Sequence, residues 1–439
     1  MIPERHQVRA ASRLEETSAV WSRKAARREK GSLTVSVEEA RKVILDAARP
    51  LGGESVSVMG AFDRILYEDV ISDIMIPPLD DSAMDGYAVI AEDTLGASRS
   101  NPVRLRVAGE VRAGGSNLTR RVSRGTAIRI MTGAPIPRGA DSVIRFEETE
   151  EEGGYVKVFS ESAKRGNCKC AGESIGKGET MLRKGDRLKS ADVGILVSLN
   201  HDTIRVYKQP TVSIISTGDE LAEIGEESRT GQTRNVNAYT LYSETKRYNA
   251  LPQYLGIARD TVEDMKEKLL EALESDVVIS TGGVSTGKYD LVKQAYSELD
   301  VEIIFESIRV KPGRPCTFGT KDGKLIFGLP GYPVPTLTSF IQFVRPALLR
   351  MMGANRIDKP VVNAVLEEDV AIRSGSLTFL RGCFTIKNGD FYVSTTGSQK
   401  SSVLSSMSRA NCLMVIPEAT EELRAGQRVA IQLIDHDEV

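Results

Sequence analysis

Residues 212–220 read Val212-Ser-Ile-Ile-Ser-Thr-Gly-Asp-Glu220, and this stretch decides the fold class. A short apolar run suited to a buried strand leads directly into a glycine turn that carries two acids. The same pattern recurs at Val278-Ile-Ser-Thr-Gly-Gly283 and at Phe327-Gly-Leu-Pro-Gly331. Helical patterns accompany these strands at residues 237–248, at 262–274 with Thr261 as the cap, and near 336–351. Apolar strands that alternate with helices indicate an α/β domain with a mostly parallel sheet.

The glycine turns predict a ligand site. In a parallel sheet, ligands bind beyond the carboxyl ends of the strands, so the three turns are expected to open on one edge. Gly282 and Gly283 let backbone N–H groups approach an anion, and the following helix presents its positive N-terminus, which predicts a phosphate site. The run from Gly282 to Lys288 also matches the start of a P-loop. However, Tyr289 stands where a P-loop needs Ser or Thr for Mg²⁺, which argues against an NTPase.

Charged residues lie close to these turns. Glu220, Asp260 and Asp290 are the nearest acids. Each alone is ordinary, because an acid after a strand often caps a helix. Together with a phosphate-binding turn they predict a Mg²⁺ ion that bridges phosphate oxygens. The turn Lys311-Pro-Gly-Arg314 places two cations where they can pair with an oxyanion, with a solvated basic turn as the alternative.

A second polar loop lies far upstream, at Pro77-Pro-Leu-Asp-Asp-Ser-Ala-Met-Asp-Gly-Tyr-Ala-Val89. It gathers three carboxylates and a serine beside a rigid Pro-Pro entry, and Gly86 opens a strand. Such a loop suits a divalent cation or the rim of a polar ligand, and a solvated acidic turn is the alternative. Alternating strands at 103–107 and 127–130 predict a small β domain around it. Strand and turn patterns return after Lys359, which predicts a C-terminal β domain.

Composition sets the broad class. The chain has 439 residues, 41% of them hydrophobic and 27% charged, which is typical of soluble globular domains. A net charge of −2 does not favour nucleic-acid binding. No apolar run approaches the ~20 residues of a membrane span, and no secretory signal is recognisable. Five cysteines indicate a reducing compartment, so a cytoplasmic protein is expected, and the Cys168-x-Cys170 pair is interpreted as two ordinary thiols.

The N-terminal segment separates into a tail and a helix. Residues 1–31 are rich in charge, lack an apolar face and are predicted to be a disordered basic tail. Ser36 and Glu39 form a capping box that begins an amphipathic helix. Residues 173–208 are expected to rejoin this helix.

We expect deletion of residues 1–31 to leave folding intact, because this segment has little apolar surface to bury. The melting temperature of the truncated chain should match that of the full chain. A large decrease would show that the tail docks on the folded body.

Several of these motifs together resemble the MoeA/gephyrin E-domain family of molybdopterin molybdenumtransferases. The resemblance covers the chain from about Ser36 to its end. It rests on the loop at 77–89 and on five further motifs, at 127–137, 216–221, 280–285, 311–315 and 328–331. Motifs that occur in the same order are more specific than any one alone.

The resemblance implies a multidomain α/β and β fold. Beyond the tail of residues 1–31, an elongated discontinuous domain is expected from residues 32–76 with 173–208. An inserted β domain covers 77–172, a MogA-like α/β domain with a mostly parallel sheet covers 209–357, and a C-terminal β barrel covers 358–439.

The resemblance also implies the roles of residues. The matching catalytic positions are Asp85, Thr132, Glu220 and Lys311, and Asp85 would reach the site across a dimer interface. The expected Mg²⁺ ligands are Glu220, Asp260 and Asp290. The expected contacts with the pterin nucleotide are Ser216, Thr217, Gly218, Gly282, Gly283, Ser285, Pro330, Gly331 and Pro333.

The activity implied is insertion of molybdate or tungstate into adenylylated molybdopterin with Mg²⁺, with release of AMP. The implied partners are a second copy of the chain and the molybdopterin adenylyltransferase, with no nucleic acid and no membrane. The sequence departs from the family at five positions. The family usually has an acid where this chain has Ser174, a lysine at Ser307, an asparagine at Tyr332, a serine at Pro335 and an aspartate at Asn235.

Each departure removes a charge or a small polar group. Compensation by Arg309 and Glu173 is the alternative, although the spacing of Arg309 differs from that of the family lysine. Two alternatives to the transferase therefore stay open. One is a catalytically weakened paralogue that acts as a scaffold binding a pterin or a partner. The other is a hydrolase of a different AMP conjugate.

Overall fold

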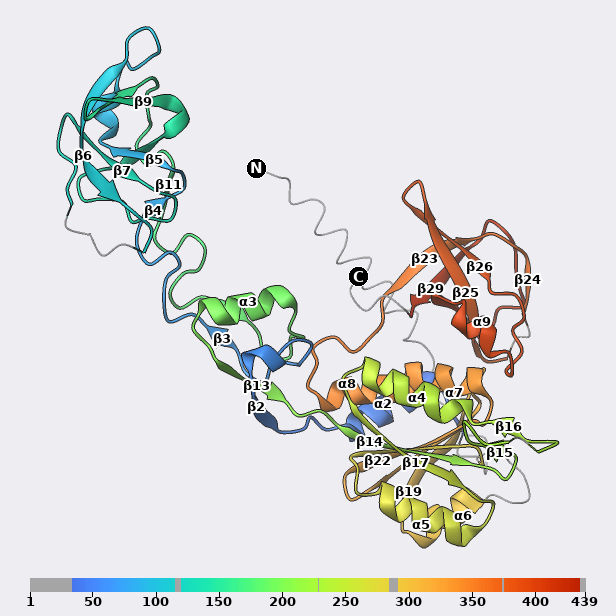
Figure 1. Cartoon of the computed structure of the whole chain (residues 1–439). Coiled ribbons are helices and arrows are strands. Elements are labelled where there is room, and N and C mark those ends of the chain that lie inside the picture. The colour runs from blue at the N-terminus through green and yellow to red at the C-terminus, as the bar shows by residue number, and fades with distance from the viewer. Residues whose placement is uncertain (1–33, 115–119, 228, 284–290, 373–374, 435–439) are drawn as a thin grey trace.

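The computed structural model describes residues 34–114, 120–227, 229–283, 291–372 and 375–434. The N-terminal tail, Ser285 and Asp290 lie outside these ranges. Figure 1 shows an elongated molecule in which a β domain stands at one end, a narrow connecting region follows, and an α/β layer and a β barrel lie at the other end. No helix within the described ranges has the length and apolar character of a membrane span.

The α/β layer is built on a seven-stranded sheet with the order β1-β19-β21-β22-β18-β14-β17. Strand β21 runs antiparallel to both of its neighbours, whereas the other pairings are parallel. The strands are β1 (Thr34–Val35), β14 (Thr211–Thr217), β17 (Leu251–Ala258), β18 (Val277–Thr281), β19 (Glu302–Ile308), β21 (Pro315–Lys321) and β22 (Lys324–Leu329). The mostly parallel sheet expected from the sequence is confirmed.

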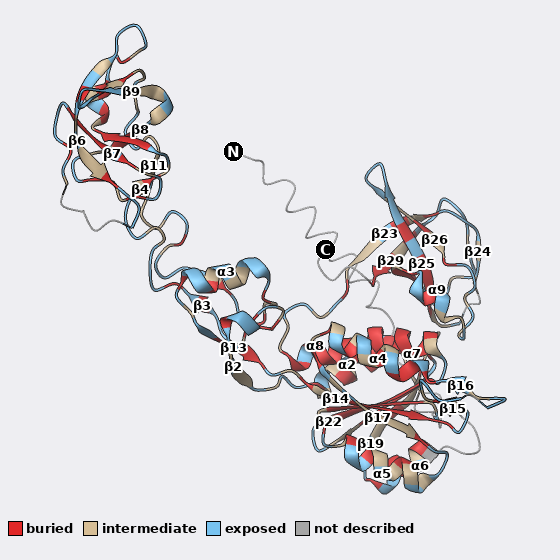
Figure 2. Cartoon of the chain, in the orientation of Figure 1, coloured by how far each residue is buried: buried red, intermediate tan, exposed pale blue. Residues whose placement is uncertain are grey.

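Helices cover both faces of this sheet, which is why its central strands β14, β18 and β22 are almost entirely buried (Figures 1 and 2). Helices α5 (Val262–Ala272) and α6 (Leu291–Glu298) lie on one face. The other face carries α2 (Val37–Ala47), α4 (Val236–Arg247), α7 (Pro333–Ser339) and α8 (Arg345–Met351), with a π-helical turn at Phe340–Val344 joining the last two. The cap of α5 at Thr261 and the capping box of α2 form as expected.

The N-terminal helix differs from expectation in its packing. The sequence predicts that residues 173–208 rejoin it, but α2 packs on the α/β layer, against α8 and β19. Its apolar stripe, which includes Val37, Ala40 and Ile44, is part of the large core of that layer. Strand β1, just before α2, extends the sheet by pairing with β19, which fixes the helix there. An apolar stripe predicts burial but does not identify the surface that buries it.

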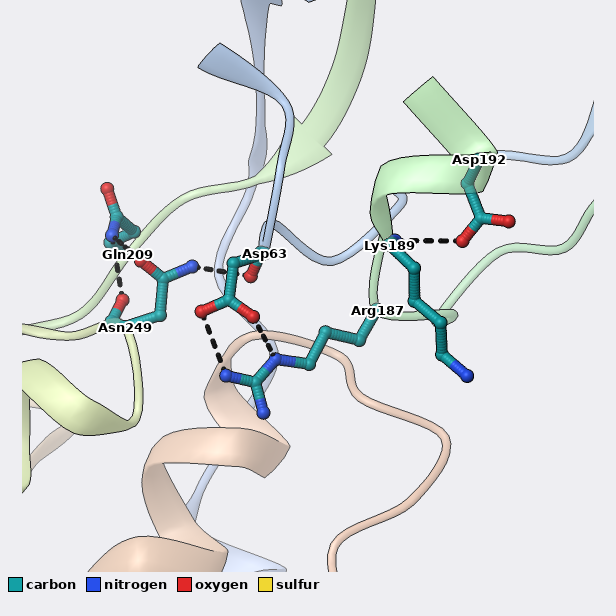
Figure 3. A network of polar contacts seen from close by, with 6 residues as sticks. All are labelled: Asp63, Arg187, Lys189, Asp192, Gln209 and Asn249. Carbon is teal, nitrogen blue, oxygen red and sulfur yellow. Dashed lines mark hydrogen bonds and ion pairs between the residues drawn. The ribbon is translucent and has the colours of Figure 1, made fainter. Parts of the chain in front are cut away.

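The connecting region (residues 53–76 and 173–207) is a narrow body with its own core, which includes Leu66, Leu188, Leu196 and Val206. It contains β2 (Gly53–Ser57) paired with β13 (Thr203–Tyr207), β3 (Val70–Ile71) paired with β12 (Thr180–Leu182), a 3₁₀ turn η1 (Val58–Gly60) and α3 (Ser190–Ser198). Polar contacts join it to the α/β layer (Figure 3). Asn249, which follows α4, donates to the Asp63 carbonyl at 2.7 Å, and Arg187 holds the Asp63 carboxylate with two nitrogens.

The inserted β domain contains a six-stranded sheet with the order β8-β5-β7-β6-β10-β9 and a core on each face. Its strands are β5 (Gly86–Val89), β6 (Val103–Val111), β7 (Thr126–Ile130), β8 (Ser142–Arg145), β9 (Thr149–Glu152) and β10 (Tyr155–Val158). Short elements complete it: β4 (Asp81–Ser82) paired with β11 (Cys168–Lys169), and the 3₁₀ turns η2 (Ala91–Thr94) and η3 (Phe146–Glu148).

The C-terminal part is a closed five-stranded barrel, because β25 pairs with β26 on one side and with β27 on the other. Its strands are β23 (Val361–Leu366), β25 (Leu377–Lys387), β26 (Asp390–Thr395), β27 (Cys412–Ile416) and β29 (Arg428–Leu433). The strand pair β24 (Val370–Ala371) and β28 (Glu422–Leu423) and the helix α9 (Leu404–Ser408) decorate it. Strand β20 (Val310–Lys311) crosses from the α/β layer to pair with β25.

Candidate functional site

The three glycine turns lie at one edge of the sheet. Ser216 pairs with Thr281, which in turn pairs with Leu329, so β14, β18 and β22 end side by side. The turn at Lys311–Arg314 belongs to the same edge, because β21 begins directly after it at Pro315 and runs antiparallel to β22. The structure therefore brings together every described α/β residue proposed for the site.

The turns approach each other so closely that only glycine fits. A Cβ atom added at Gly282 would lie 2.7 Å from the Thr217 carbonyl oxygen, and the φ angle of Gly282 is +90°. The Gly282 N–H donates to the Leu329 carbonyl at 3.1 Å, and the Thr217 hydroxyl donates to the Thr281 carbonyl at 3.1 Å. The result is a small, rigid cluster of backbone groups at the strand ends, in which the Gly282 N–H is already bonded to the Leu329 carbonyl.

Helix α7 begins inside the site. Pro330 and Gly331 follow β22, and Pro333 occupies the first turn of the helix, where a missing N–H costs nothing. Thr336 Oγ1 lies 2.5 Å from the Pro330 carbonyl oxygen and 2.7 Å from that of Tyr332, and its one proton is shared between them. The Gly331 carbonyl accepts from Asn237 Nδ2 at 2.7 Å. Thr336 and Asn237 thus hold the turn at residues 330–332 in place without a ligand.

The basic turn packs against the same helix. Gly313 has a φ of +108°, and a Cβ atom there would lie 2.8 Å from Ser339 Oγ in α7. Lys311 and Arg314, on either side, are exposed. The packing of Gly313 against α7 fixes the backbone of this turn. Lys311 and Arg314 are therefore held in solvent at the same edge of the sheet as the glycine turns.

Acids surround the opening. Glu220 is exposed, and its carboxylate covers Gly218, since a Cβ atom at Gly218 would lie 2.4 Å from Glu220 Oε2. Asp260 follows β17 and is also exposed, and its N–H donates to Asp219 Oδ1 at 3.4 Å. In the part of the chain that the structure describes, no three His, Cys, Asp or Glu side chains lie close enough together to hold a metal ion.

These acids still fit a magnesium ion. Mg²⁺ prefers hard oxygen ligands and is usually held by one or two carboxylates together with waters and substrate phosphates. Glu220 and Asp260 supply such oxygens beside the glycine turns at the strand ends. The ion would then be completed by the substrate, not by a protein cage.

A hydrogen-bond network beneath the acidic loop escaped the sequence analysis. The loop that contains Glu220 is a short excursion in which β15 (Leu221–Ala222) pairs in parallel with β16 (Thr233–Arg234). Asn235, which caps α4, accepts from Ser216 Oγ at 2.9 Å and donates to the Tyr254 hydroxyl at 2.6 Å. Tyr254 donates in turn to the Glu223 carboxylate. The N-cap pattern Asn-x-x-Ala is its only sequence signal, and that signal predicts a helix start, not a network.

Asp85 and Thr132 form a separate pair in the inserted β domain. Asp85 Oδ1 accepts from the Thr132 N–H at 2.7 Å and from its hydroxyl at 2.9 Å. These two hydrogen bonds hold the pKa of Asp85 below its usual value, so the exposed carboxylate stays ionised near neutral pH. Figure 1 shows this domain far from the α/β edge of the same chain, so the structure does not join the pair to the other site residues.

The departures have distinct environments. The Ser307 hydroxyl contacts Thr34 Oγ1 at 2.5 Å, between β19 and β1. Ser174 and Tyr332 are exposed, and Pro335 lies buried in the first turn of α7, where proline is tolerated. Asn235 is 3% exposed and both of its amide atoms are hydrogen-bonded. Arg309 is half-buried beside Ser307, and its N–H donates to the Val35 carbonyl at 2.8 Å.

The Cys168 and Cys170 thiols are free. Burial raises the pKa of Cys168 to about 11, which is the behaviour of an ordinary half-buried thiol. Arg165 Nη1 lies 2.9 Å from Cys170 Sγ.

Three family models match successive parts of the chain. Residues 35–200 match the MoeA N-terminal region (domain I and II), residues 213–350 match a probable molybdopterin binding domain, and residues 363–434 match the MoeA C-terminal region (domain IV).

Full-length relatives are also similar. A protein of Staphylococcus epidermidis named molybdopterin molybdenumtransferase is 32% identical over 402 residues, which cover 91% of this chain and 96% of that protein. A Staphylococcus aureus protein of the same name is 31% identical over 404 residues, with 92% and 96% covered. The crystal structure of the molybdopterin biosynthesis moeA protein from Pyrococcus horikoshii OT3 has a TM-score of 0.79 and 34% identity, and covers 91% of this chain and 100% of that chain.

Proposed function

The chain belongs to the MoeA family of molybdopterin molybdenumtransferases, and on that premise we propose that it inserts molybdate or tungstate into adenylylated molybdopterin with Mg²⁺ and releases AMP. Membership makes it a transferase of molybdenum cofactor biosynthesis. The observation that carries the finer proposal is the convergence of three strand-end turns, two acids and a basic turn on one edge of the sheet.

Substrate binding follows from this edge. The turns at Gly218, Gly282 and Gly331 bring backbone groups close to a phosphate or phosphoanhydride. Lys311 and Arg314 supply positive charge for the oxyanion. Asp290 and Ser285 are proposed members of the same site from their sequence positions.

The reaction requires cleavage of the phosphoanhydride bond that joins AMP to the pterin phosphate: a water oxygen bonds to phosphorus as the P–O–P bond breaks, AMP leaves, and the protons of the water pass to the phosphate products or to solvent. Glu220 and Asp260, with Asp290, would hold the Mg²⁺ ion, which when bound neutralises charge on the phosphate oxygens. Lys311 steadies the oxygen atoms of the metal oxyanion beside the pterin dithiolene. None of these residues needs to act as a nucleophile.

We further infer that two copies of the chain form the site. Asp85 and Thr132 cannot join the α/β edge of their own chain in the arrangement of Figure 1, whereas two-fold pairing of elongated chains brings distant regions together. Large apolar side chains of the connecting region are exposed, among them Met59, Phe62, Ile71, Ile74 and Met75. A dimer interface would cover such residues.

We expect the double variant Met59→Glu with Phe62→Glu to be a folded monomer, because it places two charges on surface that pairing would bury. Both side chains are more than half exposed in the isolated chain, so its melting temperature should change little. Sedimentation velocity at micromolar concentration measures the change. A native chain that sediments as a monomer would contradict the dimer.

Incubation with adenylylated molybdopterin, molybdate and Mg²⁺ tests the function by following AMP. The transferase releases AMP only when molybdate or tungstate is present. A hydrolase of AMP conjugates releases it without the oxyanion. A scaffold binds the pterin nucleotide and releases none, and the loss of a lysine at Ser307 is the observation that favours this alternative.

A further inference from the structure

The acidic loop that presents Glu220 has no core of its own. Its residues 223–227 are half-buried or exposed, and β15 and β16 are two residues each. Three backbone hydrogen bonds hold its base: the Glu220 carbonyl accepts from Thr233 N at 2.8 Å, the Ala222 carbonyl from Asn235 N at 3.1 Å, and the Gly218 carbonyl from Leu221 N at 3.2 Å. The part of the loop beyond Ala222 depends in addition on side-chain contacts.

A chain of side-chain hydrogen bonds provides that link. It begins at the end of β18, where the Thr281 hydroxyl donates to Ser216 Oγ at 3.3 Å, and Ser216 donates to Asn235 Oδ1 at 2.9 Å. Asn235 Nδ2 then donates to the Tyr254 hydroxyl at 2.6 Å, and Tyr254 donates to Glu223 Oε1. This series of hydrogen bonds thus connects the strand-end turns with the acidic loop.

The direction of donation along this series of hydrogen bonds depends on the side-chain amide of Asn235. A hydroxyl has a single proton, and that of Tyr254 is given to Glu223, so Tyr254 can only accept from residue 235. Asn235 accepts on its oxygen and donates on its nitrogen, which a carboxylate cannot do. Both of its neighbours are buried or half-buried, and Asn235 itself is 3% exposed. An amide at position 235 therefore satisfies both Ser216, which donates to it, and Tyr254, which accepts from it, whereas a carboxylate does not.

Other polar groups around Glu223 also hold it in the position in which it accepts from Tyr254. Tyr239, on α4, donates to the second carboxylate oxygen of Glu223 at 3.1 Å. The Arg234 guanidinium donates to the carbonyls of Glu223 and Glu226, each at 2.6 Å, which clamps the far side of the loop. Glu223 is thus held by two tyrosines while its backbone is held by an arginine.

We propose that Asn235 is a positioning residue: its amide locks the acidic loop to the carboxyl ends of the strands and so sets the place of Glu220. This inference rests on the proposed function for its effect on turnover, but the order of the loop can be measured without any substrate. It predicts that the amide is needed for its N–H, not for its size.

Asn235→Asp isolates that N–H. The aspartate keeps the acceptor for Ser216 and for the Ala238 N–H, so the cap of α4 is retained, but it has no proton for Tyr254. Two carboxylates then compete for one hydroxyl. Loss of such a hydrogen bond in a buried place should slow AMP release about tenfold.

Glu223→Gln restores the chain in reverse when it is combined with Asn235→Asp. Tyr254 can then donate to the aspartate and accept from the glutamine Nε2, while Tyr239 donates to the glutamine oxygen. The double variant should recover most of the rate that Asn235→Asp loses, whereas Glu223→Gln alone keeps an amide oxygen that accepts from Tyr254 and should lose little. Asn363→Asp, an exposed asparagine of the barrel, controls for the added charge.

Hydrogen exchange of the apo chain gives the second readout. Asn235→Asp should speed exchange of amides in residues 218–226 while residues 240–247 of α4 keep their protection, and the double variant should return the loop to native protection. Equal exchange and equal rates in the native and Asn235→Asp chains would overturn the proposal, as would a double variant no better than Asn235→Asp alone. If the native chain releases no AMP, the proposed function fails, and the exchange result alone decides the role of Asn235.

Discussion

Replacing Glu220 by glutamine is expected to reduce AMP release about a hundredfold or more, since loss even of groups that only support a metal ligand costs 10–100-fold. The carboxylate lies at the ligand edge, directly over Gly218, where it would hold Mg²⁺ against substrate phosphate. Its amide analogue keeps the shape but loses the charge. The melting temperature should stay close to that of the native chain, because the residue is exposed.

Glu227→Gln is the matched control for this variant, because Glu227 is an exposed acid of the same loop. It should turn over at the native rate. A Glu220→Gln chain with native turnover and native dependence on Mg²⁺ would remove Glu220 from the metal site.

Replacing Gly86 by alanine is expected to disrupt the inserted β domain, with a cost of about 3 kcal/mol or more from overpacking and broken ladder hydrogen bonds. A Cβ atom at Gly86 would lie 1.8 Å from the backbone oxygen of Ile144, and backbone cannot rotate away as a side chain can. Because Gly86 pairs with Arg145, the insertion forces β5 away from β8. Asp85, the preceding residue, would lose its fixed place.

Gly133→Ala serves as the comparison in the same domain. Gly133 also has a special conformation, with a φ of +73°, but no atom lies within 4 Å of the added carbon. Its cost should be limited to about 1 kcal/mol of backbone strain. Thermal or denaturant unfolding of the two variants measures the difference, and equal stability of both would contradict the packing argument.

The α/β layer could be predicted from the sequence because its signals are local. Buried strands such as 212–215 and the cap at Thr261 depend on short-range patterns, and β14 and α5 form there. The convergence of the turns follows from a general property of parallel sheets. The antiparallel strand β21, by contrast, has no distinctive pattern, yet it is what carries the Lys311 turn to the same edge.

Long-range packing could not be predicted in the same way. The stripe of α2 gives no indication that β1 joins β19, 273 residues away along the chain from Thr34 to Ser307. The Asn235 network likewise depends on Tyr254, which enters from a neighbouring strand. In the sequence, Asn235 stands out only as the loss of a charge. In the structure, its amide donates to the Tyr254 hydroxyl, whose own proton is donated to Glu223.

We propose that the Asp85 loop of one chain and the Glu220 edge of another form a single site for metal insertion. Mixing an Asp85→Ala chain with a Glu220→Gln chain is a direct test of this shared site. Each variant alone should be nearly inactive. In a mixed dimer one site would contain both defects and the other neither, so random exchange of subunits should recover about a quarter of the native AMP release.

The control mixes Glu220→Gln with Lys311→Ala, two changes on the same α/β edge, which leave no intact site in any pairing. We expect AMP release to recover in the first mixture and not in the second, with molybdate or tungstate required throughout. No recovery above the parent variants in the first mixture, from chains shown to form mixed dimers, would contradict it.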